Sequence, residues 1–270
     1  AMAFLESGHL DRGRKLLYRV LASMNIPVPS SRPGVIASFL FLRARLALRG
    51  MDFMARTQDE IPANLLDRAD ACSSAASGIG YADPLEGGVY QVRSMLLALE
   101  TGDAERISRA MAMEGAFTAA LGERGADKAL GLLDQAQQMA LDSDNPRGLG
   151  EVLAARTIAM LQLGRWRDCL DAATESRALL QQHGKGSSWY LSTAESYHLG
   201  ALGFLGRLDE AYEAFCGALA HSRRKGDLHG ELHARLGMEF PPYLIVDDPQ
   251  RAATDAAQAA DLFPMEGFHL

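Results

Sequence analysis

The sequence has few cysteines, few aromatic residues and no long apolar run, and each shortage excludes a class of protein. Its three cysteines, Cys72, Cys169 and Cys216, are an odd number at wide spacing, which excludes a disulfide framework and a CxxC metal motif. Free cysteines of this kind fit a reducing compartment, so we expect a cytoplasmic protein. The longest apolar run, residues 34–42, is too short to span a bilayer, and the first residues lack a signal-peptide pattern.

An excess of basic charge is also missing. Acidic residues outnumber basic ones by 34 to 27, which gives a formal net charge of −7. Such a chain is a poor nucleic-acid binder, and we expect neither a nucleic-acid nor a membrane partner. The composition, 48% apolar and 23% charged, is that of a globular protein. Only 7% of the residues are aromatic. Alanine and leucine fill the apolar share and favour helices.

The sequence does contain a repeat. Turns carrying Gly or Asp separate helical stretches, and four of them end on a small residue one turn into the next helix. These residues are Ala129, Cys169, Ala211 and Ala252, spaced 40, 42 and 41 residues apart. A fixed period of this size is typical of a helical array, in which each repeat packs on its neighbours.

We therefore predict an all-α protein, a right-handed α-α superhelix of about 12 antiparallel helices in one domain over residues 1–270. The segments 25–33 and 51–62 are expected to be irregular. The helices are predicted at residues 9–24, 33–49, 62–80, 84–101, 103–121, 126–142, 146–163, 166–182, 187–205, 208–224, 227–246 and 249–262.

The turns of the form Gly-x-x-x-x-Ala, with Leu before the Gly, resemble tetratricopeptide (TPR) repeats. The matching residues are Leu163, Gly164, Cys169, Leu202, Leu205, Gly206, Ala211 and Phe215. The period here is longer than the 34 residues of that family. The family's Trp and Tyr positions are mostly Leu, Met or Ala, so the array is TPR-like rather than a standard TPR.

A second resemblance covers nearly the whole chain. Residues 7–13, 41–50, 161–166 and 266–270 resemble the helical region of large bacterial signalling proteins. In those proteins a serine/threonine kinase domain precedes a STAND-type ATPase module, and TPR-like helices follow. The resemblance implies a regulatory arm for protein–protein interaction or ligand sensing. Because Ala1 precedes Met2 as in a cloning remnant, and the last residues carry no polar tail, both ends are expected to be cuts through a longer chain.

Catalytic signatures are missing from the sequence. It has no His-Arg-Asp loop, no Asp-Phe-Gly and no Gly-x-x-x-x-Gly-Lys-Ser/Thr phosphate loop. Residues 184–188 look superficially like a phosphate loop but lack its first Gly and a preceding strand. They are better explained as a helix connection in which Ser187 or Ser188 caps the next helix. We expect no enzyme activity and no cofactor.

Candidate binding residues lie on the first helix of successive pairs, which lines the concave face of TPR-like arrays. There they would hold a protein or peptide partner or a small-molecule effector, because polar-tipped aromatics are enriched at recognition surfaces. For Trp189 and Tyr190 the alternative is packing between repeats. The candidates are Arg147, Glu151, Arg156, Tyr190, Tyr197, His198, His229 and His233.

Two other functions stay open. His229 and His233 are four residues apart on one predicted helix face, a spacing that can hold a metal in a groove-sited hydrolase with a third ligand from Asp227 or His221. A polar surface pair is the plainer explanation. The chain could also be a stand-alone adaptor that forms a homodimer through exposed end repeats, because its ends carry the apolar Phe4 and Phe268.

Overall fold

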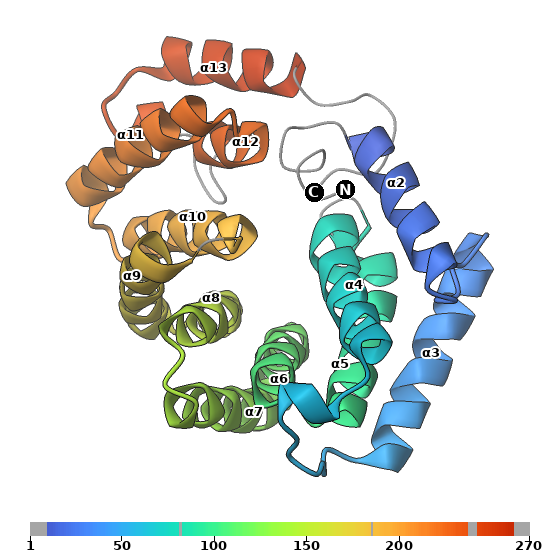
Figure 1. Cartoon of the computed structure of the whole chain (residues 1–270). Helices are drawn as coiled ribbons and strands as arrows, with labels where there is room; N and C mark the ends of the chain where they lie inside the picture. The colour runs from blue at the N-terminus through green and yellow to red at the C-terminus, as the bar shows by residue number, and fades with distance from the viewer. Residues whose placement is uncertain (1–9, 81–82, 185, 237–241, 262–270) are drawn as a thin grey trace.

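The fold is all-α. A computed structural model describes residues 10–80, 83–184, 186–236 and 242–261, and within them it contains twelve α-helices, two short 3-10 turns and no strand (Figure 1). The α-helices are α2 (Leu10–Ser23), α3 (Arg32–Arg49), α4 (Ala63–Gly80), α5 (Pro84–Thr101), α6 (Ala104–Ala119), α7 (Glu123–Asp142), α8 (Pro146–Gln162), α9 (Trp166–His183), α10 (Ser188–Phe204), α11 (Leu208–Lys225), α12 (Leu228–Leu236) and α13 (Pro249–Asp261). The 3-10 turns are η1 (Gln58–Glu60) and η2 (Pro242–Leu244).

Local sequence sets where the helices begin and end. Before α8, the Asn145 side chain accepts a hydrogen bond from the Gly148 N–H, and Pro146 occupies the first turn. Between α8 and α9, Gly164 adopts a left-handed φ of +70°, and the Arg165 N–H donates to the Met160 carbonyl at 2.9 Å. This Gly-closed ending is favourable because glycine has no Cβ to clash.

The prediction of about twelve antiparallel helices is confirmed, and most predicted bounds fall within three residues of the observed ones. One helix differs. The segment 227–246 was expected to be a single helix, but α12 is described only to Leu236, and residues 242–244 form the 3-10 turn η2. Pro242 has no N–H to donate to a preceding turn, which explains why an α-helix does not continue through it.

One expected turn is also misplaced. The turn that ends on Ala129 was expected at residues 124–129, but α7 already begins at Glu123. The actual turn ends at Gly122, whose φ of +64° provides the left-handed residue, while Gly125 lies inside the helix. There Gly125 permits a close crossing, because a Cβ would lie 2.3 Å from the Thr118 carbonyl oxygen.

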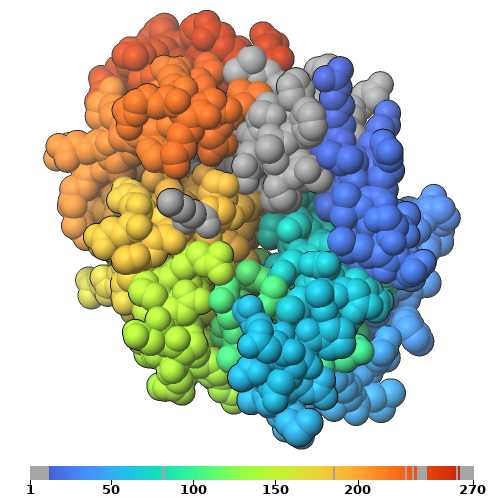
Figure 2. Space-filling model, in the orientation of Figure 1, coloured from blue at the N-terminus to red at the C-terminus, as the bar shows by residue number. Residues whose placement is uncertain are grey.

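The helices from α4 onward form a solenoid of consecutive antiparallel pairs: α4/α5, α6/α7, α8/α9, α10/α11 and α12/α13. The first helices also contact one another in order, α4 with α6, α6 with α8, α8 with α10 and α10 with α12. Figure 1 shows these first helices on the inside of an arc and α7, α9, α11 and α13 on its outside. The arc brings α13 back to the same side of the molecule as α2 (Figures 1 and 2).

Small residues at the repeat positions allow the pairs to pack closely. The four residues that define the period, Ala129, Cys169, Ala211 and Ala252, are all buried, the first three completely. One hydrophobic core runs through the solenoid from α3 to α13. The small side chains therefore act as contact points between helices, as their spacing predicted.

The first two helices do not follow the pairing of the rest. α2 packs against α4, and α3 packs against α5, while Figure 1 shows α2 and α3 nearly end to end along the outside. α5 is buried on nearly every side, because it contacts α3, α4 and α6. Among the described helices, none is long and apolar enough to cross a bilayer.

Candidate functional site

Charged and polar side chains meet on the inside of the arc, where α4, α6, α8 and α10 face one another. Asp70 of α4 binds both arginines of α6. It accepts a hydrogen bond from Arg106 Nε at 3.0 Å and one from Arg109 Nη2 at 2.9 Å. We call the following set the inner polar cluster: Asp70, Arg106, Arg109, Glu151, Ser187 and Tyr190.

Glu151 of α8 is the most deeply buried charge of the cluster, with a side chain only 3% exposed. Its Oε1 accepts a hydrogen bond from the Ser187 hydroxyl at the start of α10. Its Oε2 lies 3.6 Å from Arg109 Nη1, too far for a hydrogen bond, and has no hydrogen-bond partner among the described residues. Buried acceptors are almost always paired, so this oxygen is an open hydrogen-bonding position.

Tyr190, in the first turn of α10, closes the other side of the cluster and is 8% exposed. Burial raises the pKa of its phenol, although the Arg109 charge and the nearby Ser73 hydroxyl of α4 act in the opposite direction. Tyr190 and Ser73 thus lie close together although their helices are not neighbours along the array. Tyr190 therefore packs between inner helices, the alternative raised for it from the sequence.

The electrostatics of the cluster keep its central arginine charged. Burial disfavours the Arg109 guanidinium, but Tyr190, Glu151 and Asp70 outweigh this effect and raise its pKa. A second ion pair borders the cluster, where Arg147 of α8 and Glu105 of α6 bind each other. Arg147 is 39% exposed, so this border reaches solvent.

The structure thus brings three of the predicted residues, Arg147, Glu151 and Tyr190, to one region of the inner face. It places others elsewhere. Arg156 lies half a turn around α8 from Glu151 and binds Asp134 and Gln137 of α7. Tyr197, on α10, is partly buried against the main hydrophobic core.

His198 also lies outside the cluster. Its imidazole is near Arg177 of α9 and Arg207 before α11, and its Nδ1 is buried without a hydrogen-bond partner among the described residues. Burial, together with the charges of these two arginines, lowers its pKa to about 4. A neutral, partly buried imidazole near the outer helices is a packing residue rather than part of the inner face.

The remaining predicted positions are only partly described. His229 and His233 lie on α12, and their side chains are outside the described part of the structure, as are residues 1–9 and 262–270 with Phe4 and Phe268. Asp227, named as a third metal ligand, accepts hydrogen bonds from the Gly230 N–H at 2.9 Å and from the Ser192 hydroxyl at 3.0 Å. Among the described residues, no group of three His, Cys, Asp or Glu side chains could hold a metal ion.

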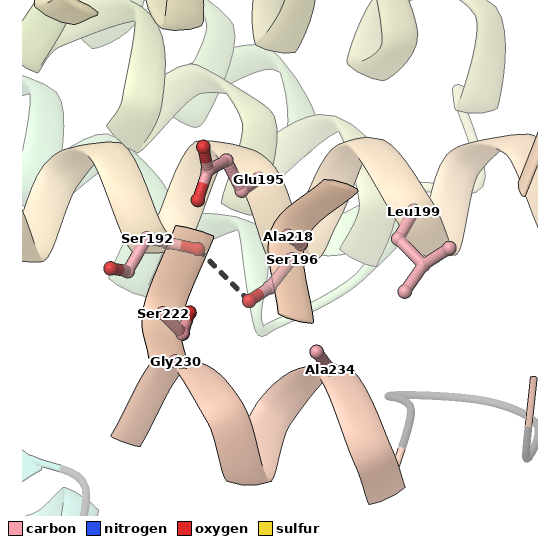
Figure 3. Close-up of a pocket in the computed structure, with 8 residues that line it drawn as sticks. All are labelled: Ser192, Glu195, Ser196, Leu199, Ala218, Ser222, Gly230 and Ala234. Atoms are coloured by element: carbon pink, nitrogen blue, oxygen red, sulfur yellow. Dashed lines mark hydrogen bonds between the residues drawn. The ribbon is translucent and has the colours of Figure 1, made fainter. Parts of the chain in front are cut away.

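A separate cavity lies between α10, α11 and α12 (Figure 3). Its volume is about 10 Å³, enough for one water at most, so it is too small for an organic ligand. Burial raises the pKa of Glu195 on its wall, against the opposing charges of His221 and Arg177. The lining residues are Ser192, Glu195, Ser196, Leu199, Ala218, Ser222, Gly230 and Ala234.

We did not predict Asp70, Arg106, Arg109 or the role of Ser187 from the sequence. Arg106 and Arg109 are three residues apart and so share a helix face, and α4 and α6 are first helices of their pairs. Searching the first helix of each pair for charged residues three or four positions apart could have identified these two arginines. Ser187 precedes α10 as predicted, but its side chain makes no capping hydrogen bond and binds Glu151 instead.

Taken together, the inner polar cluster offers guanidinium donors, carboxylate acceptors and a phenol on one surface. This set suits recognition of polar groups, such as the N–H and C=O groups of a peptide. No protein-family model matches the chain, and no curated protein matches it either.

Proposed function

We propose that the chain is a non-catalytic interaction scaffold of the cytoplasm whose inner face binds a peptide segment of a partner protein at the inner polar cluster. Solenoids expose long inner surfaces suited to such segments. The resemblance of its turns and of residues 41–50 and 161–166 to helical regions of kinase–STAND ATPase proteins supports a role as the regulatory arm of such a protein.

One observation carries the proposal. Glu151 is a nearly fully buried carboxylate whose Oε2 has no hydrogen-bond partner among the described residues, beside the charged Arg109. A buried and incompletely satisfied ion pair costs stability compared with apolar residues of the same size. Once the segment displaces the side chains that cover Oε2, one of its N–H groups would satisfy this oxygen, and a carbonyl of the same segment would accept from Arg109 or Arg106.

The solvent-facing edge of the cluster gives a route for such a segment. Asp70 is 42% exposed, whereas Arg106 and Arg109 are 16% and 17% exposed. A peptide approaching past Asp70 would therefore meet first a carboxylate and then two guanidinium groups. We expect the bound segment to be polar, with both donors and acceptors at the position that enters the cluster.

The test is an array of random nine-residue linear peptides probed with the purified chain, followed by affinity measurements on the peptides that bind. We expect binders to lose at least tenfold in affinity on Glu151→Gln and on Asp70→Asn. The matched control is Arg156→Gln, on the opposite face of α8, which should leave affinity unchanged. Circular dichroism establishes that each variant is folded.

Two results would contradict the proposal: an array with no binder, or binders that lose nothing in both cluster variants. The regulatory-arm part has its own test, the gene sequence upstream of this segment. A kinase catalytic loop followed by a phosphate loop is expected there. A gene that lacks both loops would contradict the regulatory-arm part. The binding proposal would still be tested separately by the peptide array.

A further inference from the structure

Helix α3 exposes an apolar side to solvent. Leu48 is 90% exposed, Phe41 67%, Leu40 62% and Ile36 46%. At 100° per residue, these four and three exposed alanines fall within a sector of about 140° that contains no polar residue. We call this surface the outer apolar face of α3: Ile36, Ala37, Leu40, Phe41, Ala44, Ala47 and Leu48.

This face is not a general property of the outer helices. Among the described residues, α7, α9 and α11 each expose one large apolar side chain: Leu141, Trp166 and Leu208. α3 exposes four, and it buries a second apolar side, with Val35, Leu42 and Leu46, in the core. A helix that is apolar on both sides is normally covered on both sides.

The pairing of the helices indicates what kind of element would fit beside α3. Every later helix pair packs side by side and antiparallel, but α2 lies end to end with α3 and leaves it packed mainly along α5. Figures 1 and 2 place α3 on the outer side of the molecule. The position beside α3 is therefore one that a helix occupies in the rest of the array.

The basic charge of α2 and α3 indicates that a helix bound beside α3 would be acidic. Residues 10–49 contain eight basic side chains and one acidic residue, Asp11, in a chain whose net charge is −7. α3 itself has four arginines and no Asp or Glu. Arg32 and Arg43 bind Asp83 and Glu114. Arg45, at the border of the outer apolar face, is exposed and forms no ion pair or hydrogen bond within the described residues.

From these observations we infer a docking site on the outer apolar face of α3 for an amphipathic helix of another protein. The helix would present leucine- or isoleucine-like side chains to the face and Asp or Glu to Arg45. The face runs from Ile36 to Leu48, about 18 Å along the axis, so it fits a helix of some 12 to 16 residues.

Other occupants fit the face less well. A second copy of the chain would bring another basic α3 against this one, and one helix face is far smaller than the roughly 800 Å² per partner of a standard stable interface. An anionic membrane would be attracted by α2 and α3 but repelled by the rest of the chain, because the net charge is −7.

The test uses a display library of 16-residue helices with a fixed Leu/Ile stripe and randomised flanking positions, selected on the full chain. We expect Asp and Glu to be enriched in the flanks. A selected peptide should lose at least tenfold in affinity on Leu40→Glu. The same peptide should also bind the Arg45→Glu variant more weakly. A version of the peptide with Lys in place of its acidic flanking residues should regain affinity for this variant.

Matched controls are Leu141→Glu, an exposed leucine on α7, and Arg124→Glu, an exposed arginine of the same helix. Neither should change affinity, and nor should Glu151→Gln, because the site does not depend on the inner polar cluster. These substitutions are at exposed or separate positions, and circular dichroism with thermal melts verifies folding.

Several results would overturn the inference. They are a selection without helical binders, enrichment of basic or neutral flanks, or equal binding to Leu40→Glu and wild type. Binding to phosphatidylserine vesicles that Leu40→Glu abolishes would instead assign the face to a membrane. A dimer in light scattering that Leu40→Glu converts to a monomer would assign it to a second copy.

Discussion

Single buried groups determine how this fold responds to pH, and His198 is the clearest of them. Burial and the charges of Arg177 and Arg207 lower its pKa to about 4, whereas an unfolded histidine has a pKa of about 6.5. The unfolded state therefore binds the proton first as the pH falls. The stabilisation from a neutral His198 is complete above pH 6.5 and is lost as the pH drops toward 4.

We expect His198 to lower the free energy of unfolding by roughly 1–2 kcal/mol between pH 7 and pH 4.5, after discounting for partial exposure. In urea titrations at pH 7, 6, 5 and 4.5, His198→Gln should show a shallower decline than wild type. His183→Gln, at an exposed position at the end of α9, serves as the control and should keep the wild-type decline. Identical slopes for wild type and His198→Gln would refute the prediction.

The buried ion pair of the inner polar cluster gives a second prediction. Arg109→Met leaves Glu151, 3% exposed, without its counter-charge, and we expect a loss of about 3 kcal/mol in the free energy of unfolding. Adding Glu151→Leu should recover at least half of that loss, because no unpaired buried charge remains. Urea denaturation of both single variants and the double variant measures the coupling.

The exposed pair between Arg156 and Asp134 provides the comparison. Asp134 is 65% exposed, so Arg156→Met should cost less than about 1 kcal/mol in the free energy of unfolding.

The prediction for the cluster would be contradicted if the Arg109 and Glu151 effects on the free energy of unfolding simply add, because the two side chains would then not be coupled.

The part of the site that depends on spacing within one helix could be predicted from the sequence, whereas the part that depends on contacts between helices could not. Arg147 and Glu151 are four residues apart on a helix placed on the inner side by the repeat pattern, so their position was predictable. Arg156, half a turn away on the same helix, follows from the same geometry. Asp70 and Arg109 come together only through the packing of α4 on α6, which no short-range sequence signal reports.

Close crossings between helices make some glycines irreplaceable and others not. At Gly87 of α5, a Cβ would lie 2.5 Å from the Gly80 Cα of α4, and both atoms belong to packed helices. Gly131, on the exposed side of α7, has no atom within 4 Å of the corresponding position. The same Gly→Ala change should therefore have opposite effects at these two sites.

We expect Gly87→Ala to reduce the free energy of unfolding by about 1–3 kcal/mol, because the α4/α5 pair must separate. Gly131→Ala should increase it by roughly 0.5–1 kcal/mol, because alanine is the better helix former. Thermal melts and urea titrations of both variants measure the difference. A destabilised Gly131→Ala, or a neutral Gly87→Ala, would show that the crossing is looser than described.

Helix bounds were largely predictable because their signals are local, as with Asn145 and Pro146 before α8. The predicted helix 227–246 was wrong although the sequence carries a local signal against it, because Pro241 and Pro242 cannot donate helical hydrogen bonds. The outer apolar face of α3 was also missed. In the sequence, Leu40 and Leu48 look no different from the core residues Leu42 and Leu46, and only packing separates them.

Across the whole molecule, the array is more than a row of nearest-neighbour contacts. Tyr190 of α10 lies close to Ser73 of α4, although two complete pairs and α5 separate their helices along the chain. In an ordinary solenoid each repeat touches only its neighbours. We therefore expect this contact to help hold the curvature of the arc.

Tyr190→Ala should loosen that curvature. For a compact chain of this length the radius of gyration is about 18 Å, and we expect an increase of about 1 Å in small-angle X-ray scattering. Tyr212→Ala, on α11, removes a partly buried tyrosine that takes no part in the inner contact and should leave the radius unchanged. An unchanged radius in Tyr190→Ala would mean that the pair packing alone sets the curvature.

The repeat period predicted the antiparallel pairs and their order, because small residues such as Cys169 and Ala211 mark each crossing. It did not predict how tightly the array curves. Curvature accumulates from small rotations at each pair, and a period in the sequence records the presence of a crossing but not its angle.

The contact between Tyr190 and Ser73 also has a consequence for folding kinetics. The pairs α4/α5, α6/α7 and α8/α9 are built from contacts between neighbouring helices, and such local contacts form fast. Joining α10 to α4 requires the intervening pairs to be in place, because it closes a long loop of chain. We therefore expect closure of the arc to be the last step of folding, and we expect this junction to open first while the helix pairs stay intact.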